Sequence, residues 1–234
     1  RINANSNGGR GHANTTRDHA AGVSADHVVD PLPHSELLSQ CASFHPEFSD
    51  LPRKFKIALS GSATDRAATL VHDSGVHALR NETGEIGFRI LVGGGLGRTP
   101  VIGHVIRDFL PREEILNYLD AILRVYNRFG RRDNIYKARI KILVKEMTLE
   151  VFTRHVESEW QRLQGGPATV PDEEIQRIAA FFAPPPYERL PGDDAGFRAG
   201  VADNRAFANW VKRNVFPHKV PGYAAVTLSL KKTG

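Results

Sequence analysis

LPRKFKIAL, residues 51–59, is the stretch from which the architecture is most readily inferred. Within it, apolar residues alternate with Lys54, Lys56 and Ala58, and a period of two is typical of a half-buried strand. Side chains two residues apart point to one face of a strand, so Lys54 and Lys56 form a compact cationic wall suited to an oxyanion. The same pattern fits a solvated strand face, which is the commoner case, and the pattern alone leaves both interpretations open.

Further apolar patterns lie downstream of this strand. Two short runs joined by the turn residues 81–84 predict two more strands. Apolar residues on one face, with Glu113 and Glu114 in the first turn and Gly130 at the end, predict a long helix. The expected strands are 76–79 and 88–92, and the expected helices are 111–129, 133–147 and 148–163.

The two ends of the chain carry weaker patterns. Residues 1–30 are rich in Asn, Ser, Gly, His and Ala and predict irregular structure, followed by a short helical pattern around residues 37–41. Gly and Pro interrupt the chain from 165 to 200 around one helical pattern at 172–182, which predicts a linker. Residues 223–230 predict a terminal strand that needs partners supplied from elsewhere, because a single strand is not stable alone.

Composition restricts the classes of protein and of site. The 234 residues carry 31 Lys and Arg against 26 Asp and Glu, a formal net charge of +5, and 41% are hydrophobic, which is enough for a packed core. No run approaches the roughly 18–20 apolar residues of a membrane span, and no charged-then-apolar leader opens the chain, so we expect a soluble, cytoplasmic protein. The single cysteine, Cys41, excludes a disulfide framework and a cysteine-bound zinc or iron–sulfur site within this sequence. His72-Asp73 could form a polarised histidine, but no histidine has metal-ligand spacing.

Two further segments could bind an anion. The glycine-rich run at 93–97 allows backbone N–H groups to approach a ligand, but it lacks the P-loop and dinucleotide-binding spacings and also fits a flexible turn. Basic residues between 131 and 145 place Lys137, Lys141 and Lys145 on one face of the next expected helix. Such a face suits phosphate groups or simply solvent.

Several segments occur in a particular order along the chain. They are LPRKFK (51–56), His72-Asp73, GFRILVGGGLG (87–97), GRRDN (130–134) with KARIK (137–141), and NVFPHKVPGY (214–223). This ordered set resembles the assimilatory nitrite/sulfite reductase haemoproteins, which hold a sirohaem coupled to a 4Fe–4S cluster. The resemblance covers about residues 14–234.

The resemblance implies site residues and cofactors. In the family, the two lysines of the L-P-R-K-F-K strand bind the substrate anion and the sirohaem carboxylates, which assigns Lys54 and Lys56 as the catalytic cations. Nearby ammonium groups hold the charge of the anion and relay protons from water during the six-electron reduction of sulfite to sulfide. Related nitrite reductases tend to carry Asn at the second position, so Lys56 favours sulfite. The implied cofactor-binding residues are Arg53, Lys54, Lys56, Gly93, Gly94 and Gly95.

The sequence departs from the family in two places. The family has Arg immediately before Asn in the segment matching residues 14–16, where this chain has Ala13, and Arg10 and Arg17 lie nearby without matching. The four cysteines that hold the cluster lie in the family's C-terminal half, which this sequence lacks. Because sirohaem electronics depend on the axial thiolate and the cluster, we expect the chain to be inactive alone. Its first residue, Arg1, also leads us to expect a fragment or a processed piece.

The fold implied by the resemblance is α+β. A mixed β-sheet carries the Lys54/Lys56 strand, helices of 111–163 cover it, and the first strand of a ferredoxin-like repeat stands at the C-terminus. The expected divisions are 1–50, an irregular lead-in with one short helix; 51–165, a sirohaem-domain-like half; 166–213, a linker with short helices; and 214–234, the incomplete start of a second ferredoxin-like repeat.

The resemblance also implies partners. They are the missing C-terminal half of the reductase, sulfite or nitrite, and an electron donor that is a flavoprotein, a ferredoxin or NADPH-linked. No membrane is implied. A nitrite reductase on the same scaffold, a basic nucleic-acid-binding module and an inactive remnant stay as alternatives. The nucleic-acid module is disfavoured, because no reading motif or stacking platform is recognisable.

Overall fold

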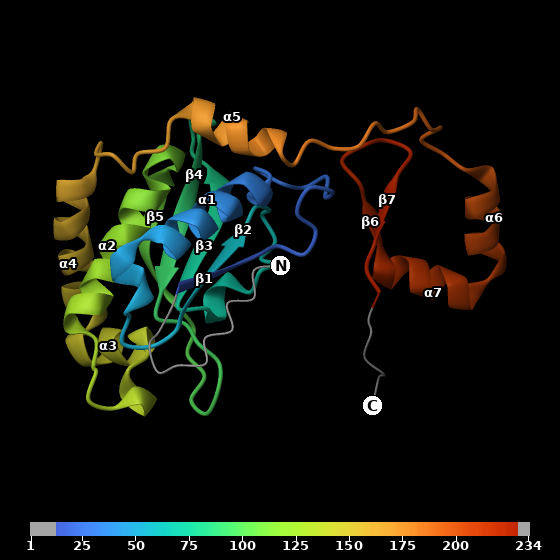
Figure 1. Cartoon of the computed structure of the whole chain (residues 1–234). Coiled ribbons are helices and arrows are strands. Elements are labelled where there is room, and N and C mark those ends of the chain that lie inside the picture. Colours follow the sequence, from blue (N-terminus) through green and yellow to red (C-terminus); the bar gives the residue numbers. More distant parts are fainter. Residues whose placement is uncertain (1–12, 229–234) are drawn as a thin grey trace.

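A mixed five-stranded β-sheet forms the centre of the computed structural model, which describes residues 13–228 (Figure 1). The strands are β1 (Ala13–Arg17), β2 (Phe55–Ser60), β3 (Ser74–Arg80), β4 (Ile86–Val92) and β5 (His104–Pro111), hydrogen-bonded in that order. The first three strands run parallel, and β4 and β5 are each antiparallel to the strand before. The mixed sheet expected from the sequence is therefore confirmed.

Two strands of this sheet were not expected. The prediction that the lead-in is irregular is wrong for residues 13–17, while residues 1–12 lie outside the described part of the chain. β1 is mostly polar and shows no apolar alternation, so it forms through its pairing along β2. β5 pairs with β4 through two register shifts opposite residues 88–91, and such irregularity breaks the period of two by which a strand is recognised.

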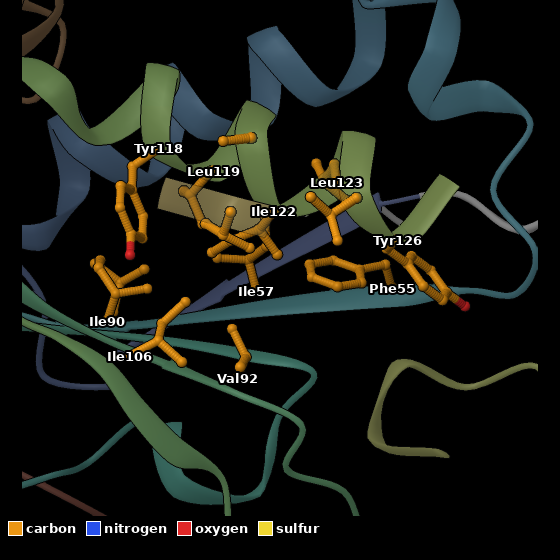
Figure 2. Packing of buried hydrophobic residues seen from close by; sticks show 14 of the residues in the cluster. Phe55, Ile57, Ile90, Val92, Ile106, Tyr118, Leu119, Ile122, Leu123 and Tyr126 are labelled. Carbon is orange, nitrogen blue, oxygen red and sulfur yellow. The ribbon is translucent and has the colours of Figure 1, made fainter. Parts of the chain in front are cut away.

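Helices cover one face of the sheet, and the core lies between the two layers (Figure 1). They are α1 (Pro31–Phe44), α2 (Ile115–Phe129), α3 (Ile140–Met147) and α4 (Leu149–Leu163). Phe55 and Ile57 of β2 are at most 1% exposed and pack against Ile122 and Tyr126 of α2 (Figure 2). Lys54 and Lys56 are exposed, so the alternation in LPRKFKIAL is confirmed.

Two helices begin later than their apolar patterns predict. α2 begins at residue 115 because β5 continues to Pro111 and residues 112–114 form a 3-10 turn. α3 begins at residue 140 because residues 135–137 form a separate 3-10 turn, in which the Asn134 side chain accepts a hydrogen bond from the N–H of Tyr136. Lys137 therefore does not share a helix with Lys141 and Lys145, and the predicted continuous basic face is wrong.

The C-terminal region extends beside the main body (Figure 1). Within the stretch expected as a linker, α5 (Asp172–Ala180) buries Ile175 and Ile178 in a second cluster with Leu37 of α1, so this helix belongs to the body. The following helices, α6 (Ala195–Asp203) and α7 (Arg205–Asn214), bury no residue. None of the helices found between residues 13 and 228 combines the length and the apolar character that crossing a bilayer requires.

The last described strands form a two-stranded ribbon. β6 (Val215–Pro217) pairs antiparallel with β7 (Ala224–Val226). The expectation that the terminal strand needs a partner from elsewhere is wrong, because its partner lies in the same short segment. Residues 229 and 230, included in the predicted strand, lie outside the described residues.

Candidate functional site

The start of β2 borders a cavity of about 230 Å³. Its lining comes from four separate stretches: the entry to β2, the segment before β3, the loop after β4 and the segment before α3. The lining residues are Lys54, Lys56, Val71, His72, Asp73, Leu96 and Arg139. Tertiary structure thus brings Lys54 and Lys56 together with His72, Asp73 and Arg139, which lie in separate motifs of the sequence.

The side chains of Lys54 and Lys56 extend from the same face of the sheet. Phe55 between them is fully buried in the core, whereas both lysines are exposed, so their side chains point away from the helical layer. Their predicted placement on one face is confirmed, and both line the cavity. Two ammonium groups beside a small cavity attract an anion.

A buried ion pair completes the charged lining. The carboxylate of Asp73 is fully buried, and its Oδ1 accepts hydrogen bonds from Nε and Nη2 of Arg139 at 2.9 and 2.6 Å. Its Oδ2 accepts a hydrogen bond from the backbone N–H of Lys56 at 3.0 Å. Burial raises the pKa of Asp73, and the guanidinium of Arg139 opposes that rise. The lining therefore combines three cationic side chains with one carboxylate.

The His72-Asp73 pair does not act as a polarised histidine. The Nδ1 atom of His72 lies 2.7 Å from the carbonyl oxygen of Ala68, and the carboxylate of Asp73 is bonded to Arg139 and Lys56 instead. Arg139 stands 66 positions after Asp73, so no local spacing in the sequence could have revealed their pairing.

The glycine run packs backbone against backbone. Gly93, Gly94 and Gly95 are buried and none of them lines the cavity, which is reached instead by Leu96. The N–H of Gly93 donates to the carbonyl oxygen of Asp73 at 3.0 Å, and the N–H of Gly95 donates to that of Val101 at 2.9 Å. Two of the three N–H groups are thus already bonded within the backbone.

Gly94 has a packing reason to be glycine. A Cβ at this position would lie 2.6 Å from the carbonyl oxygens of Leu70 and His72. Real Cβ atoms essentially never approach backbone this closely, so no larger residue fits without a shift of the chain. The run therefore holds the loop after β4 against the segment before β3, next to the cavity.

The other predicted cations point elsewhere. The guanidinium of Arg53 donates to the carbonyl oxygen of Ile135 at 3.0 Å and is not part of the cavity lining. Arg131 is paired with Asp133 at 2.6 Å. Of the basic segment between 131 and 145, only Arg139 lines the cavity.

The position where the family has Arg lies beside the lysine strand. Ala13 pairs with Phe55 in the β1–β2 ladder and packs against the core, and the next pair in the ladder is Asn14 with Lys56. Arg17 pairs with Leu59 at the far end of β1. Arg10 lies outside the described residues. Among residues 13–228, Arg139 is thus the arginine that reaches the cavity.

The comparison with protein families agrees with the ordered motifs. Residues 8–163 match the family model described as the Nitrite and sulphite reductase 4Fe-4S domain. This chain belongs to that family. The matched residues include the whole five-stranded sheet, helices α1 to α4 and every residue that lines the cavity. The family and the α+β fold expected from the sequence are both confirmed.

Individual relatives match the same part of the chain. Sulfite reductase (ferredoxin) 1 of Mycolicibacterium paratuberculosis is 33% identical over 153 residues, which are 64% of this chain and 27% of that protein. The chloroplastic ferredoxin–nitrite reductase of Arabidopsis thaliana is 30% identical over 142 residues, 58% of this chain and 24% of that one. The solved structure of Mycobacterium tuberculosis NirA aligns with a TM-score of 0.59 at 28% identity, covering 65% of this chain and 28% of that chain. This family member thus spans about a quarter of the length of the curated relatives it matches.

The two cofactors implied by the family fit this chain unequally. The lysines and the arginine of the cavity suit the carboxylates of a sirohaem. The donor set for a 4Fe–4S cluster does not fit, because Cys41 is the single cysteine of the sequence and packs on α1 against the core, where burial raises the pKa of its thiol. Within residues 13–228, no group of three or more His, Cys, Asp or Glu could hold a metal ion.

Proposed function

We propose that this chain supplies the anion pocket of a sirohaem-dependent sulfite reductase, which reduces sulfite to sulfide with six electrons. The observation that carries the proposal is the grouping of Lys54, Lys56 and Arg139 around one cavity in a member of the nitrite and sulphite reductase family. Three cations around a small cavity bind a compact anion strongly when water is partly excluded.

The residues that line the cavity have different roles in binding and protonating the anion. Lys54 and Lys56 hold the negative charge of the substrate or of the sirohaem carboxylates, and their ammonium groups donate protons as oxygen leaves the anion. Arg139 adds a positive charge, and the orientation of its guanidinium is fixed by two hydrogen bonds to Asp73. A bound sirohaem would pass the electrons of the external donor to the anion. Arg53 and the Gly93–Gly95 run support the pocket from outside the lining, through their contacts with neighbouring backbone.

The remaining parts of the enzyme come from outside this chain. The ligands of the 4Fe–4S cluster belong to a cysteine-bearing C-terminal half, with which this chain combines. Both curated relatives described above are ferredoxin enzymes by name, so we propose a ferredoxin as the electron donor.

The test is to produce this chain together with a cysteine-bearing C-terminal half of the same family in cells that make sirohaem. We expect tetrapyrrole absorption bands in the combined sample and none in the chain alone, because the pocket needs both halves. Bands in neither sample, with both halves folded, would contradict the proposed pocket.

Lys56→Asn tests the site in the combined enzyme. Loss of one charge-assisted hydrogen bond predicts a fall in kcat/KM for sulfite of roughly ten- to a hundredfold, with little change in the free energy of unfolding. The matched control is Lys145→Asn, an exposed lysine on α3 that does not line the cavity. Equal turnover and equal sulfite affinity in the Lys56 variant would overturn the assignment.

A nitrite reductase is the second candidate, favoured by the similarity to the Arabidopsis thaliana enzyme. It uses the same cationic pocket, because nitrite is also a small oxyanion. Supplying the combined enzyme with each anion and measuring sulfide and ammonia separates the two functions.

A further inference from the structure

We propose that Asp73 is the positioning residue of this pocket, and that it holds together the three chain segments that carry the pocket's charged walls. This inference rests on the proposed function, because it concerns how the pocket binds an anion. Asp73 itself need not touch the anion. Its role is to fix where Lys56, Arg139 and the loop after β4 stand relative to one another.

Each of the three segments is bonded to a different part of Asp73. Its Oδ1 accepts from Nε and Nη2 of Arg139 at 2.9 and 2.6 Å, which anchors the segment before α3. Its Oδ2 accepts from the backbone N–H of Lys56 at 3.0 Å, which anchors the entry to β2. Its carbonyl oxygen accepts from the N–H of Gly93 at 3.0 Å, which anchors the loop after β4.

The hydrogen bond between the Asp73 carboxylate and the N–H of Lys56 lies just before the first pair of the β2–β3 ladder. The parallel ladder between β2 and β3 begins at Ile57 and Ser74, so Lys56 lies one residue before the first ladder pair. The carboxylate of Asp73 takes the N–H of Lys56 at this point. Fixing that N–H sets the direction in which the backbone of Lys56 enters the strand, and thus the side of the strand from which its side chain leaves.

Burial makes the arrangement depend on Asp73. Its side chain is fully buried and the Arg139 side chain is 21% exposed, so neither charge is well solvated. Removing one partner of such a pair leaves the other uncompensated. The carboxylate also reduces the repulsion among Lys54, Lys56 and Arg139, while the lining keeps an excess of positive charge for an anion.

The test compares Asp73→Asn with Asp18→Asn in the full chain, using sulfite as the probe. Asparagine at position 73 keeps the shape and can still accept from Lys56, but it loses the charge that holds Arg139. Asp18 is a matched control, because its side chain is also fully buried and accepts a hydrogen bond from Nε of Arg66 at 3.1 Å. It lies away from the pocket: it follows β1, and its N–H donates to the carbonyl oxygen of Leu59 at the other end of β2.

Sulfite binding is followed through the backbone amide resonances of the pocket residues. We expect Asp73→Asn to raise the Kd for sulfite by about tenfold or more in the folded protein, and Asp18→Asn to lower stability without changing that Kd. An unchanged Kd in folded Asp73→Asn would overturn the proposal and leave Asp73 as a stabilising ion pair only.

Two further measurements keep the result decisive. If Asp73→Asn does not fold, Arg139→Lys retains the charge but loses the two parallel bonds, and wild-type sulfite affinity in that variant would overturn the proposal. If the wild-type chain alone does not bind sulfite, the same variants are compared in the enzyme combined with its C-terminal half, and absence of sulfite binding there would refute the proposed function. The positioning role is also decided without an anion: Asp73→Asn should shift the amide resonance of Lys56, whose N–H is bonded to the Asp73 carboxylate, and a change confined to Arg139 would contradict it.

Discussion

The hydroxyl group of Tyr126 lies between two walls of the pocket. It donates a hydrogen bond to the carbonyl oxygen of Ala138 at 2.7 Å and also lies 3.4 Å from the carbonyl oxygen of Arg53. Ala138 directly precedes Arg139, and Arg53 directly precedes Lys54. Tyr126→Phe therefore removes one polar atom that is close to the chain on both sides of the cavity.

The expected loss of stability follows from the burial of both partners. Tyr126 is fully buried and Ala138 is 1% exposed, so the carbonyl oxygen of Ala138 would be left without its donor and away from water. An unsatisfied buried polar group costs about 1–3 kcal/mol. The ring itself stays, so its packing against Phe55, with ring centroids 5.7 Å apart, is retained. We expect a loss of about 2 kcal/mol in the free energy of unfolding, and a Tm lowered by roughly 4–8 °C.

Tyr118→Phe is the matched control. Tyr118 is also fully buried on α2, its hydroxyl donates to Oε1 of Glu157 at 2.6 Å, and neither residue lines the cavity. Urea unfolding followed by circular dichroism should show a comparable loss in both variants. Only Tyr126→Phe should shift the amide resonances of Lys54 and Arg139. A loss below about 0.5 kcal/mol, or unchanged pocket resonances, would refute the reasoning.

Two other perturbations have defined outcomes. Gly94→Ala should destabilise the fold by several kcal/mol, because its Cβ would lie 2.6 Å from the carbonyl oxygens of Leu70 and His72; a stability within about 0.5 kcal/mol of the wild type would contradict this. Hydrogen bonds from Arg66 are the main cause that lowers the pKa of Asp26 from 3.8 to about 2. A carboxyl whose pKa is lower in the folded state stabilises the fold above its unfolded pKa, so this contribution is present above about pH 4 and is lost as the pH falls to about 2. Arg66→Met should therefore lower the Tm at pH 5 and flatten the fall in Tm between pH 4 and pH 2, and a parallel fall in both proteins would show that Arg66 is not its source.

The elements with a strong local pattern could be predicted from the sequence. In β2 the alternation is visible because Phe55 and Ile57 face the helices while Lys54 and Lys56 face away. The helical face of α2 is visible because most of its residues are buried on one side. Elements held by long-range pairing were missed. Apolar residues do not alternate in β1, and in β5 the register shifts disturb the alternation.

The candidate site divides in the same way. The sequence by itself determined that Lys54 and Lys56 share one face, that a cysteine-held cluster cannot be built within this chain, and that the ordered motifs belong to one family. Only the tertiary structure decided that Asp73 pairs with Arg139 rather than with His72, and that the Gly93–Gly95 run supports the cavity rather than lining it. The physical reason is range. Alternation and helical periodicity act between neighbours, whereas a buried carboxylate bonds to whichever cation the packing of the sheet and helices brings to it.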